Sequence, residues 1–324
     1  MSLEPQTPVR STRIATIPLV LLAFVCGSGV AFQSRINGEL GQRLHDGFAA
    51  ADVSFASGLI LVLIVLAFSR HGRRGFRQVA SAVRSREVPF WYVLGGSAGA
   101  FLVLGQGIAA GVLGAALFTV GVVAGQTVGG LVVDRRGLGT MLPKPLTIPR
   151  VVGSAIALIA VGVAVSTQLT GNEPFWLLLL PLAAGLGQSW QQAVNGQVRA
   201  IAESALTSTL INFIVGTIVL TIALSVDVAL AGWPSRFPTE PWVYLGGPVG
   251  VCFIAISAMI VRSLGVLLLS LGTIAGQLVT SLLIELVAPV AGHPVTLTTA
   301  VGTSLTLVAL VIAEIPRRRA KASK

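Results

Sequence analysis

Two short polar motifs carry the side chains of this sequence that are best suited to hydrogen-bond a solute. The stretch QSRING at residues 33–38 returns as QQAVNG at residues 191–196, and a Gly-x-Gly stands four residues before each copy. Each copy has a Gln and an Asn four residues apart, so on a helix the two amides share one face. Amides are costly to bury in lipid, so these should point at protein or at water. The first candidates for substrate binding are therefore Gln33, Asn37, Gln191 and Asn195.

Three further side chains extend this candidate substrate-binding site. Gln126 and Gln277 occupy matching positions in the two halves of the chain, each directly after Ala-Gly and deep within an uncharged run. Trp190 precedes the second motif and offers a surface for stacking. The alternative interpretation of the amides is structural, because polar side chains in membrane bundles also hydrogen-bond to neighbouring helices.

Glu39 is the carboxylate best placed to carry a coupling proton, since it follows Asn37 by two residues and is near Arg35. The ordinary alternative is a solvated or snorkelling acid at the end of a membrane span. The matching position of the second half is Gln197, so a coupling role for Glu39 would be asymmetric. Three other acids also stand at span ends, namely Asp134, Glu203 and Glu285.

Catalytic and metal-binding chemistry finds no support in the sequence. The two cysteines lie inside apolar runs of different halves, and the three histidines are scattered. Neither set has the spacing of a metal site or of a disulfide framework. We therefore expect no metal, no cofactor and no catalytic residue.

The polar motifs belong to a longer internal repeat. At an offset of 158 residues, Phe55 corresponds to Phe213. At an offset of 151 residues, the triplet 124–126 corresponds to the identical triplet 275–277. The chain is one module of about half its length, written twice.

Composition places both modules in a membrane. Hydrophobic residues make up 54% of the chain and charged residues only 10%, whereas a soluble domain has roughly 25% charged residues. In a soluble chain the net charge of +10 would suggest nucleic acid. Here the basic residues cluster between apolar runs, as membrane topology requires. The fold class that follows is an all-α polytopic membrane protein without a nucleic-acid partner.

Charge-free windows of about 20 residues, enough to cross a roughly 30 Å hydrocarbon core, define the predicted helices. The uncharged run 88–133 is long enough for two crossings, with a hinge near Gly111, and the basic stretch 70–86 is predicted to be a solvated loop. The other predicted spans are 14–34, 53–69, 151–172, 174–198, 204–226, 241–261, 263–284 and 294–313. The predicted modules are residues 13–172 and 173–315, flanked by tails at 1–12 and 316–324.

Ten spans, five in each module, make the second module start on the opposite side of the membrane, so the two modules form an inverted repeat. Basic residues decide the orientation, because Lys and Arg collect on the cytoplasmic side. With both termini cytoplasmic, 19 of the 22 Lys and Arg residues fall inside, leaving Arg35, Arg43 and Arg236 outside. The expected location is the cytoplasmic, or inner, membrane.

Five spans per module, glycine-rich helices and a Gln-x-x-x-Asn that ends the first helix of each module resemble the drug/metabolite transporter superfamily. Within it, the chain resembles a fused tandem of two YdcZ-like modules, related to the EamA type. The resemblance implies a small-molecule carrier that works by alternating access, often as an exporter. Small multidrug-resistance members of that superfamily use a membrane-embedded glutamate in the first helix, whereas the span 14–34 contains no acid.

The function expected from these features is secondary transport of a small organic metabolite or drug-like solute, with protons as the candidate coupling ion. Two alternatives remain open at this point. One is a membrane-embedded enzyme of lipid or isoprenoid metabolism, which would need acids, histidines or arginines gathered at one membrane depth. The other is a non-transporting membrane assembly partner. The few charged residues are dispersed along the chain, which favours the transporter.

Overall fold

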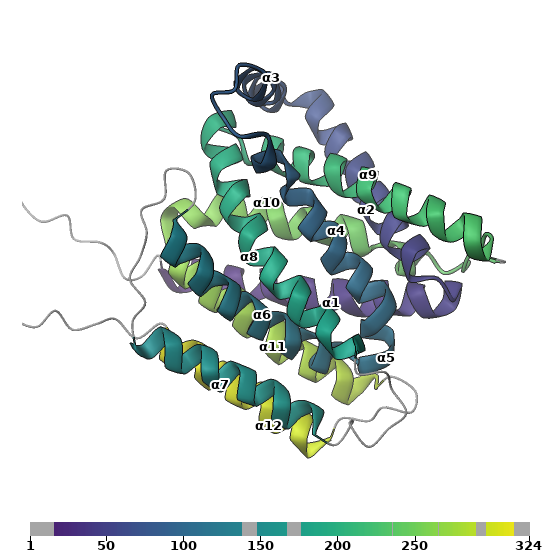
Figure 1. The fold of residues 1–324 in the computed structure, drawn as a ribbon, viewed down its shortest axis with the longest axis vertical. Helices are drawn as coiled ribbons and strands as arrows, with labels where there is room; N and C mark the ends of the chain where they lie inside the picture. The colour runs from purple at the N-terminus through teal and green to yellow at the C-terminus, as the bar shows by residue number, and fades with distance from the viewer. Residues whose placement is uncertain are drawn as a thin grey trace, which may run out of the picture.

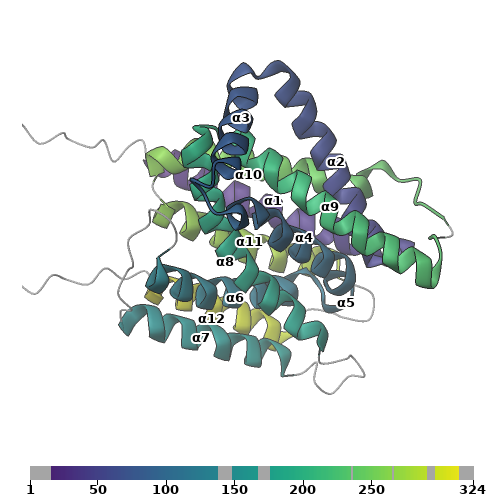
Figure 2. The ribbon, with the colours of Figure 1, turned by 45° about the horizontal axis from the view of Figure 1, so that its top comes forward.

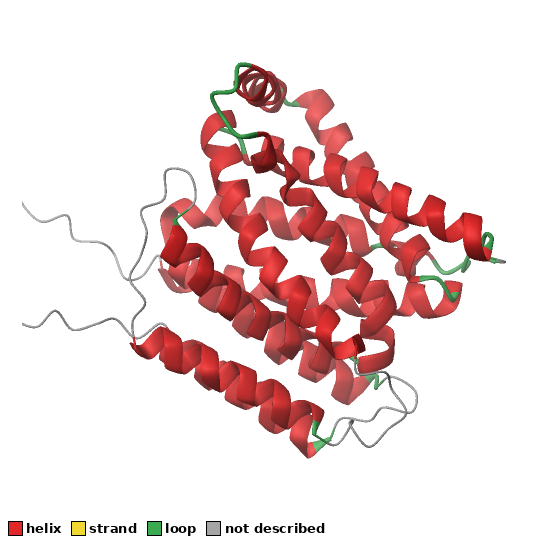
Figure 3. Ribbon diagram, viewed as in Figure 1, coloured by secondary structure: helices red, strands yellow, loops and turns green. Residues whose placement is uncertain are grey.

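The computed structural model describes residues 16–137, 148–166, 176–234, 236–264, 266–289 and 296–313. Within these ranges every regular element is a helix and no strand is present (Figure 3). By length and apolar composition, five of the described helical segments are able to cross a membrane, and three more are apolar but shorter. The all-helical fold predicted from the sequence is therefore confirmed.

The elements follow one another along the chain as shown in Figure 1. They are α1 (Thr16–Leu44), α2 (Gly47–Phe68), α3 (Arg70–Arg84), η2 (Phe90–Leu94), α4 (Gly95–Gly105), η3 (Gln106–Ala110), α5 (Gly111–Leu113), α6 (Ala115–Arg136), α7 (Ile148–Val165), α8 (Trp176–Ala202), α9 (Ala205–Ala231), η4 (Pro241–Tyr244), α10 (Gly246–Leu264), α11 (Val266–Val287) and α12 (Leu297–Ala313). The predicted tails and the predicted span ends at residues 14, 172, 174 and 294 lie outside the described residues.

Helix α1 is longer than the predicted first span and carries the whole first motif. It continues beyond residue 34, the predicted end, and buries Asn37 on one face. On another face Glu39 pairs with Arg35 at 3.6 Å and with Arg43 at 2.8 Å. Oppositely charged residues four apart stabilise a continuous helix. A charge-free window therefore underestimated its length.

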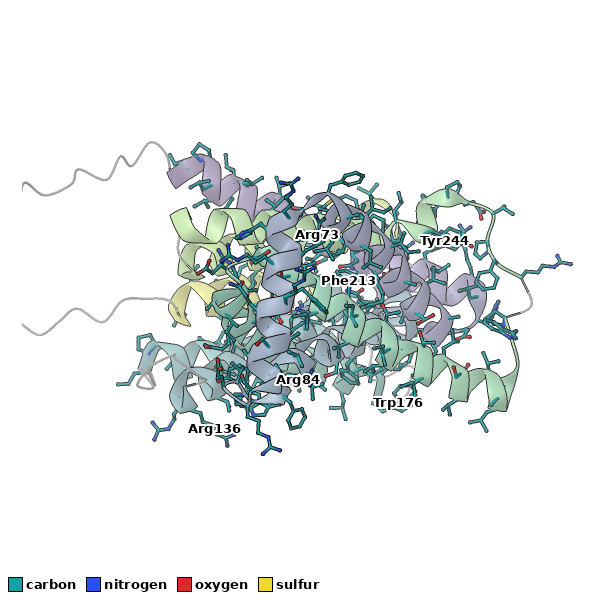
Figure 4. The ribbon with its side chains drawn as sticks, turned by 90° about the horizontal axis from the view of Figure 1, so that it is seen from above. Arg73, Arg84, Arg136, Trp176, Phe213 and Tyr244 are labelled. Atoms are coloured by element: carbon teal, nitrogen blue, oxygen red, sulfur yellow. The ribbon has the colours of Figure 1, made fainter. Side chains whose placement is uncertain are left out.

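Residues 70–84 form helix α3, so the prediction of a solvated loop at 70–86 was wrong. Ser69 caps the helix, its Oγ accepting a hydrogen bond from the backbone N–H of Gly72 at 3.0 Å. The buried positions 72, 75, 79 and 82 recur at helical spacing and form one face. The high charge of the segment had hidden this amphipathic pattern. In Figure 4, α3 lies across the direction of the long helices.

The uncharged run 88–133 is broken close to the predicted hinge. Helix α4 passes through the π-helical turn η3 into the short α5, and α6 begins after Gly114. Gly114 has a φ of 82°, a left-handed conformation that favours glycine. π-helical turns are frequent at functional positions, and η3 packs directly against α1.

Helix contacts come in matched pairs when the two halves are aligned. Helix α1 packs against α11 and α10, while its counterpart α8 packs against α6 and α4. Helix α2 packs against α9, and α7 lies beside α12, as Figures 1 and 2 both show. Each of these contacts in one half has a counterpart in the other half. The two sequence modules are thus interleaved rather than packed as separate bodies.

Glycines make the closest of these contacts possible. A Cβ atom at Gly125 or Gly185 would collide with a backbone carbonyl oxygen of the facing helix, at the α6–α8 contact. The same holds at Gly27 and Gly276, at the matching α1–α11 contact. Small residues let membrane helices approach this closely, which adds van der Waals contact between their backbones.

Phe55 of α2 and Phe213 of α9 meet where the two halves join. Their ring centroids are 5.1 Å apart and the ring planes are tilted by 44°. Each ring fills the space above a glycine of the other helix, Phe55 at Gly216 and Phe213 at Gly58. These positions, paired in the sequence by the 158-residue offset, are therefore neighbours in space.

Candidate functional site

A cavity of about 380 Å³ lies between the two halves, beside the Phe55–Phe213 pair. Helices α1, α2, α4, α8, α9, α10 and α11 all contribute to its wall. Its lining combines amides and hydroxyls with aromatic rings, and a single arginine. The polar and charged members are Gln33, Ser54, Gln188, Gln191, Gln192, Asn195, Arg199, Ser208, Thr209, Asn212 and Thr273, and the aromatic members are Phe55, Phe213 and Phe253.

The second motif forms one side of this cavity through a chain of amide hydrogen bonds. Gln191 Nε2 donates to Asn212 Oδ1 at 3.0 Å, and Asn212 Nδ2 donates to Asn195 Oδ1 at 2.6 Å. Asn212 Nδ2 also reaches the backbone carbonyl of Ser208, at 3.1 Å. Each amide holds its neighbour in a fixed orientation, and all three also line the cavity.

Asn212 was not among the residues predicted from the sequence. The signal was present, because the 158-residue offset that relates the motifs takes Ser54 to Asn212, two polar residues in apolar runs. Both line the cavity. A search of every polar residue at that offset would have found them.

The first motif is divided between the cavity and the protein interior. Gln33 lines the cavity, but Asn37 does not and is 0% exposed. Asn37 Nδ2 donates to Gln106 Oε1 at 2.7 Å, and Gln106 Nε2 donates to Ser34 Oγ at 2.9 Å. Gln106 opens the π-helical turn η3 and is also 0% exposed. It was not predicted, because position 257, its counterpart at the 151-residue offset, is a serine and the two halves show no shared amide there.

Two buried oxygens beside this closed half have no hydrogen-bond partner among the described residues, Asn37 Oδ1 and Ser54 Oγ. Both lie next to Gly246, where a Cβ atom would stand 3.0 Å from Ser54 Oγ and nearer still to Asn37 Oδ1. The cause is a difference between the halves. Asn212 is long enough to bond Asn195, whereas the shorter Ser54 leaves Asn37 Oδ1 without a donor. An unsatisfied buried polar group costs about 1–3 kcal/mol.

Comparison with known proteins places this arrangement in a family. Residues 18–165 and residues 176–312 both match the family model described as "Putative inner membrane exporter, YdcZ". The chain belongs to the YdcZ family. No curated protein matches it. A solved structure described as "Crystal structure of protein" shares its fold, with a TM-score of 0.51 and 20% sequence identity over 94% of this chain and 97% of the other.

Membership of the YdcZ family confirms the predicted resemblance and the predicted location. The two matched segments are those of a tandem of drug/metabolite-transporter-like modules. The chain is a multi-pass inner-membrane protein of the exporter class, surrounded by lipid and acting on a small molecule. Its family is one of transporters rather than of enzymes.

The remaining predicted binding residues of this YdcZ-family chain lie outside the cavity wall. Gln126 Nε2 hydrogen-bonds to Oε1 of Gln188, which does line the cavity. Gln277 is buried beside a small void that it shares with Gln106. Trp190 packs into an apolar cluster with residues of α3, η2 and α8. Gln126 therefore contacts the cavity lining through Gln188, and Gln277 lies at a void whose lining shares Val30 and Leu102 with the cavity.

Labelled arginines and aromatic residues lie toward different ends of the bundle. In Figure 4, Arg84 and Arg136 lie toward one end, and Trp176 and Tyr244 toward the other. Arg199, near the end of α8, is the charged residue of the cavity lining, and no Asp or Glu is part of that lining. Among the described residues, no group of His, Cys, Asp and Glu has the arrangement of a metal site.

The predicted coupling acid Glu39 belongs to a charged cluster at the far end of α1. Arg43 contacts Glu39 at 2.8 Å and Glu240 at 2.7 Å, and its guanidinium lies 5.4 Å from the ring centre of Trp242. Hydrogen bonds from its own backbone and from the Arg43 side chain lower the pKa of Glu240. The cluster joins α1 to the segment before α10, and it does not reach the cavity.

Proposed function

We propose that this YdcZ-family protein is a secondary transporter that exports a small organic solute by alternating access. The moving parts would derive from two inverted five-helix repeats, residues 13–172 and 173–315. The observation that carries the proposal is that the two repeated Gln/Asn motifs differ in their exposure to the cavity. Asn195 lines an open cavity while its counterpart Asn37 is sealed in the interior.

The unpartnered oxygen of Asn37 supports a second state in which the closed half opens. Asn37 Oδ1 is buried without a partner in this state. Opening that half would give this atom water or solute to bond, which offsets part of the cost of separating packed helices. Alternating access needs two states that differ by only a few kcal/mol. An unsatisfied group on the closed side reduces that difference.

The position of the cavity fits uptake from the cytoplasm. Its lining includes Arg199 and Ala205, which flank the α8–α9 connection. In the proposed topology of ten spans with both termini inside, this connection is cytoplasmic, on the side that holds 19 of the 22 Lys and Arg residues. An exporter loads its substrate from that side.

The lining also indicates the chemistry of the solute. Amides and hydroxyls supply donors and acceptors that replace water around polar groups, and Phe55, Phe213 and Phe253 supply apolar surface. Because no Asp or Glu lines the cavity to bind a cation, the cavity suits an uncharged or anionic solute better than a cation. The volume of about 380 Å³ lies within the range of roughly 300–1,000 Å³ that is usual for small-molecule sites.

The test uses the full-length protein in two steps. Thermal-shift screening against a panel of uncharged, anionic and cationic metabolites and drugs should find stabilising solutes among the first two groups, since a ligand of the folded state raises its apparent stability. The solutes found should then exchange across proteoliposome membranes containing the protein. Binding without exchange would contradict transport. Exchange of cations alone would contradict the assignment of solute charge.

Membrane topology gives the first prediction. We expect a cysteine at Ser81, on the exposed side of α3, to be reached only from the cytoplasm, and one at Thr239, beside Glu240, only from outside. The reason is the distribution of basic residues. The measurement is labelling of intact cells with an impermeant thiol reagent, in a Cys26→Ala, Cys252→Ala background. Labelling of Ser81→Cys from outside would overturn the orientation.

Proton coupling gives the second prediction. If Glu39 carries the coupling proton, Glu39→Gln should abolish the response of solute flux to an imposed pH gradient and preserve solute binding. Glu240→Gln is the matched control, because Glu240 contacts the same arginine, Arg43, but belongs to the segment before α10. Its flux should still respond to the gradient. An unchanged response in Glu39→Gln would remove this acid from the mechanism.

A further inference from the structure

Helix α3 presents a strongly basic face that transport by the cavity does not use. Five exposed arginines of this helix lie opposite its buried face, and no acid occurs between residues 70 and 84. They are Arg70, Arg73, Arg74, Arg77 and Arg84. None of these arginines forms an ion pair with another described residue. The nearest acid along the chain, Glu87, accepts a hydrogen bond from Ser85 Oγ at 2.9 Å, just beyond the end of α3.

An apolar flank runs beside the basic face. At 100° per residue, Phe76 and Val83 fall between the buried face and the arginines. Phe76 is 39% exposed, and Phe68, at the end of α2 just before the turn into α3, is 86% exposed. The helix lies across the bundle direction (Figure 4), so in a membrane it would run along the bilayer surface. A basic face beside an exposed apolar flank is the pattern of helices that lie in the membrane interface.

Arg73 differs from the other arginines of α3 because its side chain bonds to the end of α2. Its guanidinium donates to the backbone carbonyls of Leu66 and Ala67, near the C-terminus of α2. A cation there stabilises the helix end. Arg73 thereby ties the start of α3 to the end of α2, and its own side chain is exposed on the same side of α3 as the other arginines.

We propose that α3 binds the headgroups of anionic phospholipids in the cytoplasmic leaflet. The phosphates would lie against Arg74, Arg77 and Arg84, with Phe76 among the upper acyl carbons. Guanidinium groups bind phosphate oxygens through paired hydrogen bonds. Juxtamembrane basic clusters are attracted to anionic membrane surfaces in this way.

The bound lipid would be separated from the α8–α9 connection by the width of α3. Thr207 Oγ1 donates to the carbonyl of Gly72 at 2.9 Å, and the ring Nε2 of His71 lies 2.8 Å from the carbonyl oxygen of Glu203. Both contacts join α3 to the α8–α9 connection, whose neighbour Ala205 lines the cavity. This inference goes beyond the proposed transport and does not depend on it, because lipid binding is measurable without a solute.

The experiment measures phosphatidylglycerol that stays bound to the full-length protein after extraction from mixed phosphatidylcholine and phosphatidylglycerol nanodiscs, by native mass spectrometry. The triple variant Arg74→Gln, Arg77→Gln, Arg84→Gln should bind phosphatidylglycerol at least tenfold more weakly, since each basic residue near an anionic surface contributes roughly fivefold. The corresponding triple Arg→Lys variant should retain much of the binding. Phe76→Ser should weaken it, and raised salt should release the lipid from the wild type.

Two controls decide the outcome. Arg135→Gln, Arg136→Gln removes exposed charges at the end of α6, and it should leave phosphatidylglycerol retention unchanged. Glycerol phosphate, a headgroup without acyl chains, should not displace the lipid. Equal losses in the α3 and α6 variants would overturn the proposal, because charge alone would then explain retention. Displacement by glycerol phosphate would show a free phosphate site instead.

Discussion

Gly185→Ala is expected to destabilise the protein by about 1–3 kcal/mol, the usual cost of overpacking a well-packed contact. A Cβ atom at Gly185 would overlap the carbonyl oxygen of Val122 and stand 2.7 Å from the backbone nitrogen of Gln126 and 2.9 Å from Cα of Gly125. All three atoms belong to the backbone of α6, so no side chain can turn away to relieve the overlap. The two helices would have to separate along their whole contact.

The chain supplies matched controls for this substitution. Gly130→Ala and Gly162→Ala are also helical, and nothing lies within 4 Å of the added Cβ atom at either position. There alanine favours the helix by up to about 1 kcal/mol. Thermal unfolding in detergent should therefore show a lowered melting temperature for Gly185→Ala and an unchanged or raised one for both controls. Equal melting temperatures in all three variants would contradict the α6–α8 contact.

The internal repeat extends this prediction to the other half. Gly276 faces the carbonyl oxygen of Phe24 and stands, with an added Cβ atom, 3.0 Å from the backbone nitrogen of Ser28. Because α1–α11 is the counterpart of α8–α6, Gly276→Ala should cost about as much as Gly125→Ala. The comparison tests whether the repeat found in the sequence is also a repeat in packing energy.

The sequence was sufficient to predict the features that both halves share. The recurrence of the Gln/Asn motif and of the Ala-Gly-Gln triplet predicted two equivalent modules. Charge-free runs predicted the long helices. Apolar spans are readable because every backbone polar group in lipid must be satisfied within a helix. A helix with only one apolar face was missed, because its overall charge is high. Helix α3 is the example, since its arginines hide the buried glycines Gly72 and Gly75.

The asymmetry between the halves could not be read from the motifs, because they carry the same amides. It follows from single differences at positions paired by the repeat, Ser54 with Asn212 and Gln106 with Ser257. Asn212 completes a bonded chain beside the cavity, whereas Gln106 binds Asn37 in the closed interior. A short side chain in one half is replaced by an amide in the other. The effect of such exchanges depends on three-dimensional distances that spacing alone does not give.

Asn195→Leu and Asn37→Leu should impair transport from opposite sides of the membrane. Asn195 lines the open cavity, so its replacement removes a donor and an acceptor from a bound solute, and affinity from the cytoplasmic side should fall roughly tenfold, or 1.4 kcal/mol. The fold should lose little, because Asn212 Nδ2 keeps its bond to the carbonyl of Ser208.

Asn37→Leu should leave affinity from the cytoplasmic side nearly unchanged, since Asn37 does not line the cavity. In this state the substitution leaves Gln106 Oε1 without the hydrogen bond that Asn37 Nδ2 donates. It also removes Asn37 Oδ1, a buried oxygen that already had no hydrogen-bond donor. The two effects oppose each other, so the closed half should remain stable. Affinity measured from outside should fall roughly tenfold, because in the opposite state Asn37 would take the place that Asn195 has here.

Proteoliposomes of known orientation allow both affinities to be measured on the same variant. If the amides only hold helices together, each substitution should weaken the fold by about 1 kcal/mol and change affinity equally from both sides. If Asn195 and Asn37 line the transport path in alternate states, Asn195→Leu should lower affinity from the cytoplasmic side and Asn37→Leu should lower affinity from outside. The melting temperatures of the two variants should be similar. The double variant separates the cases further, because independent losses on two sides should add, whereas a shared structural defect should not.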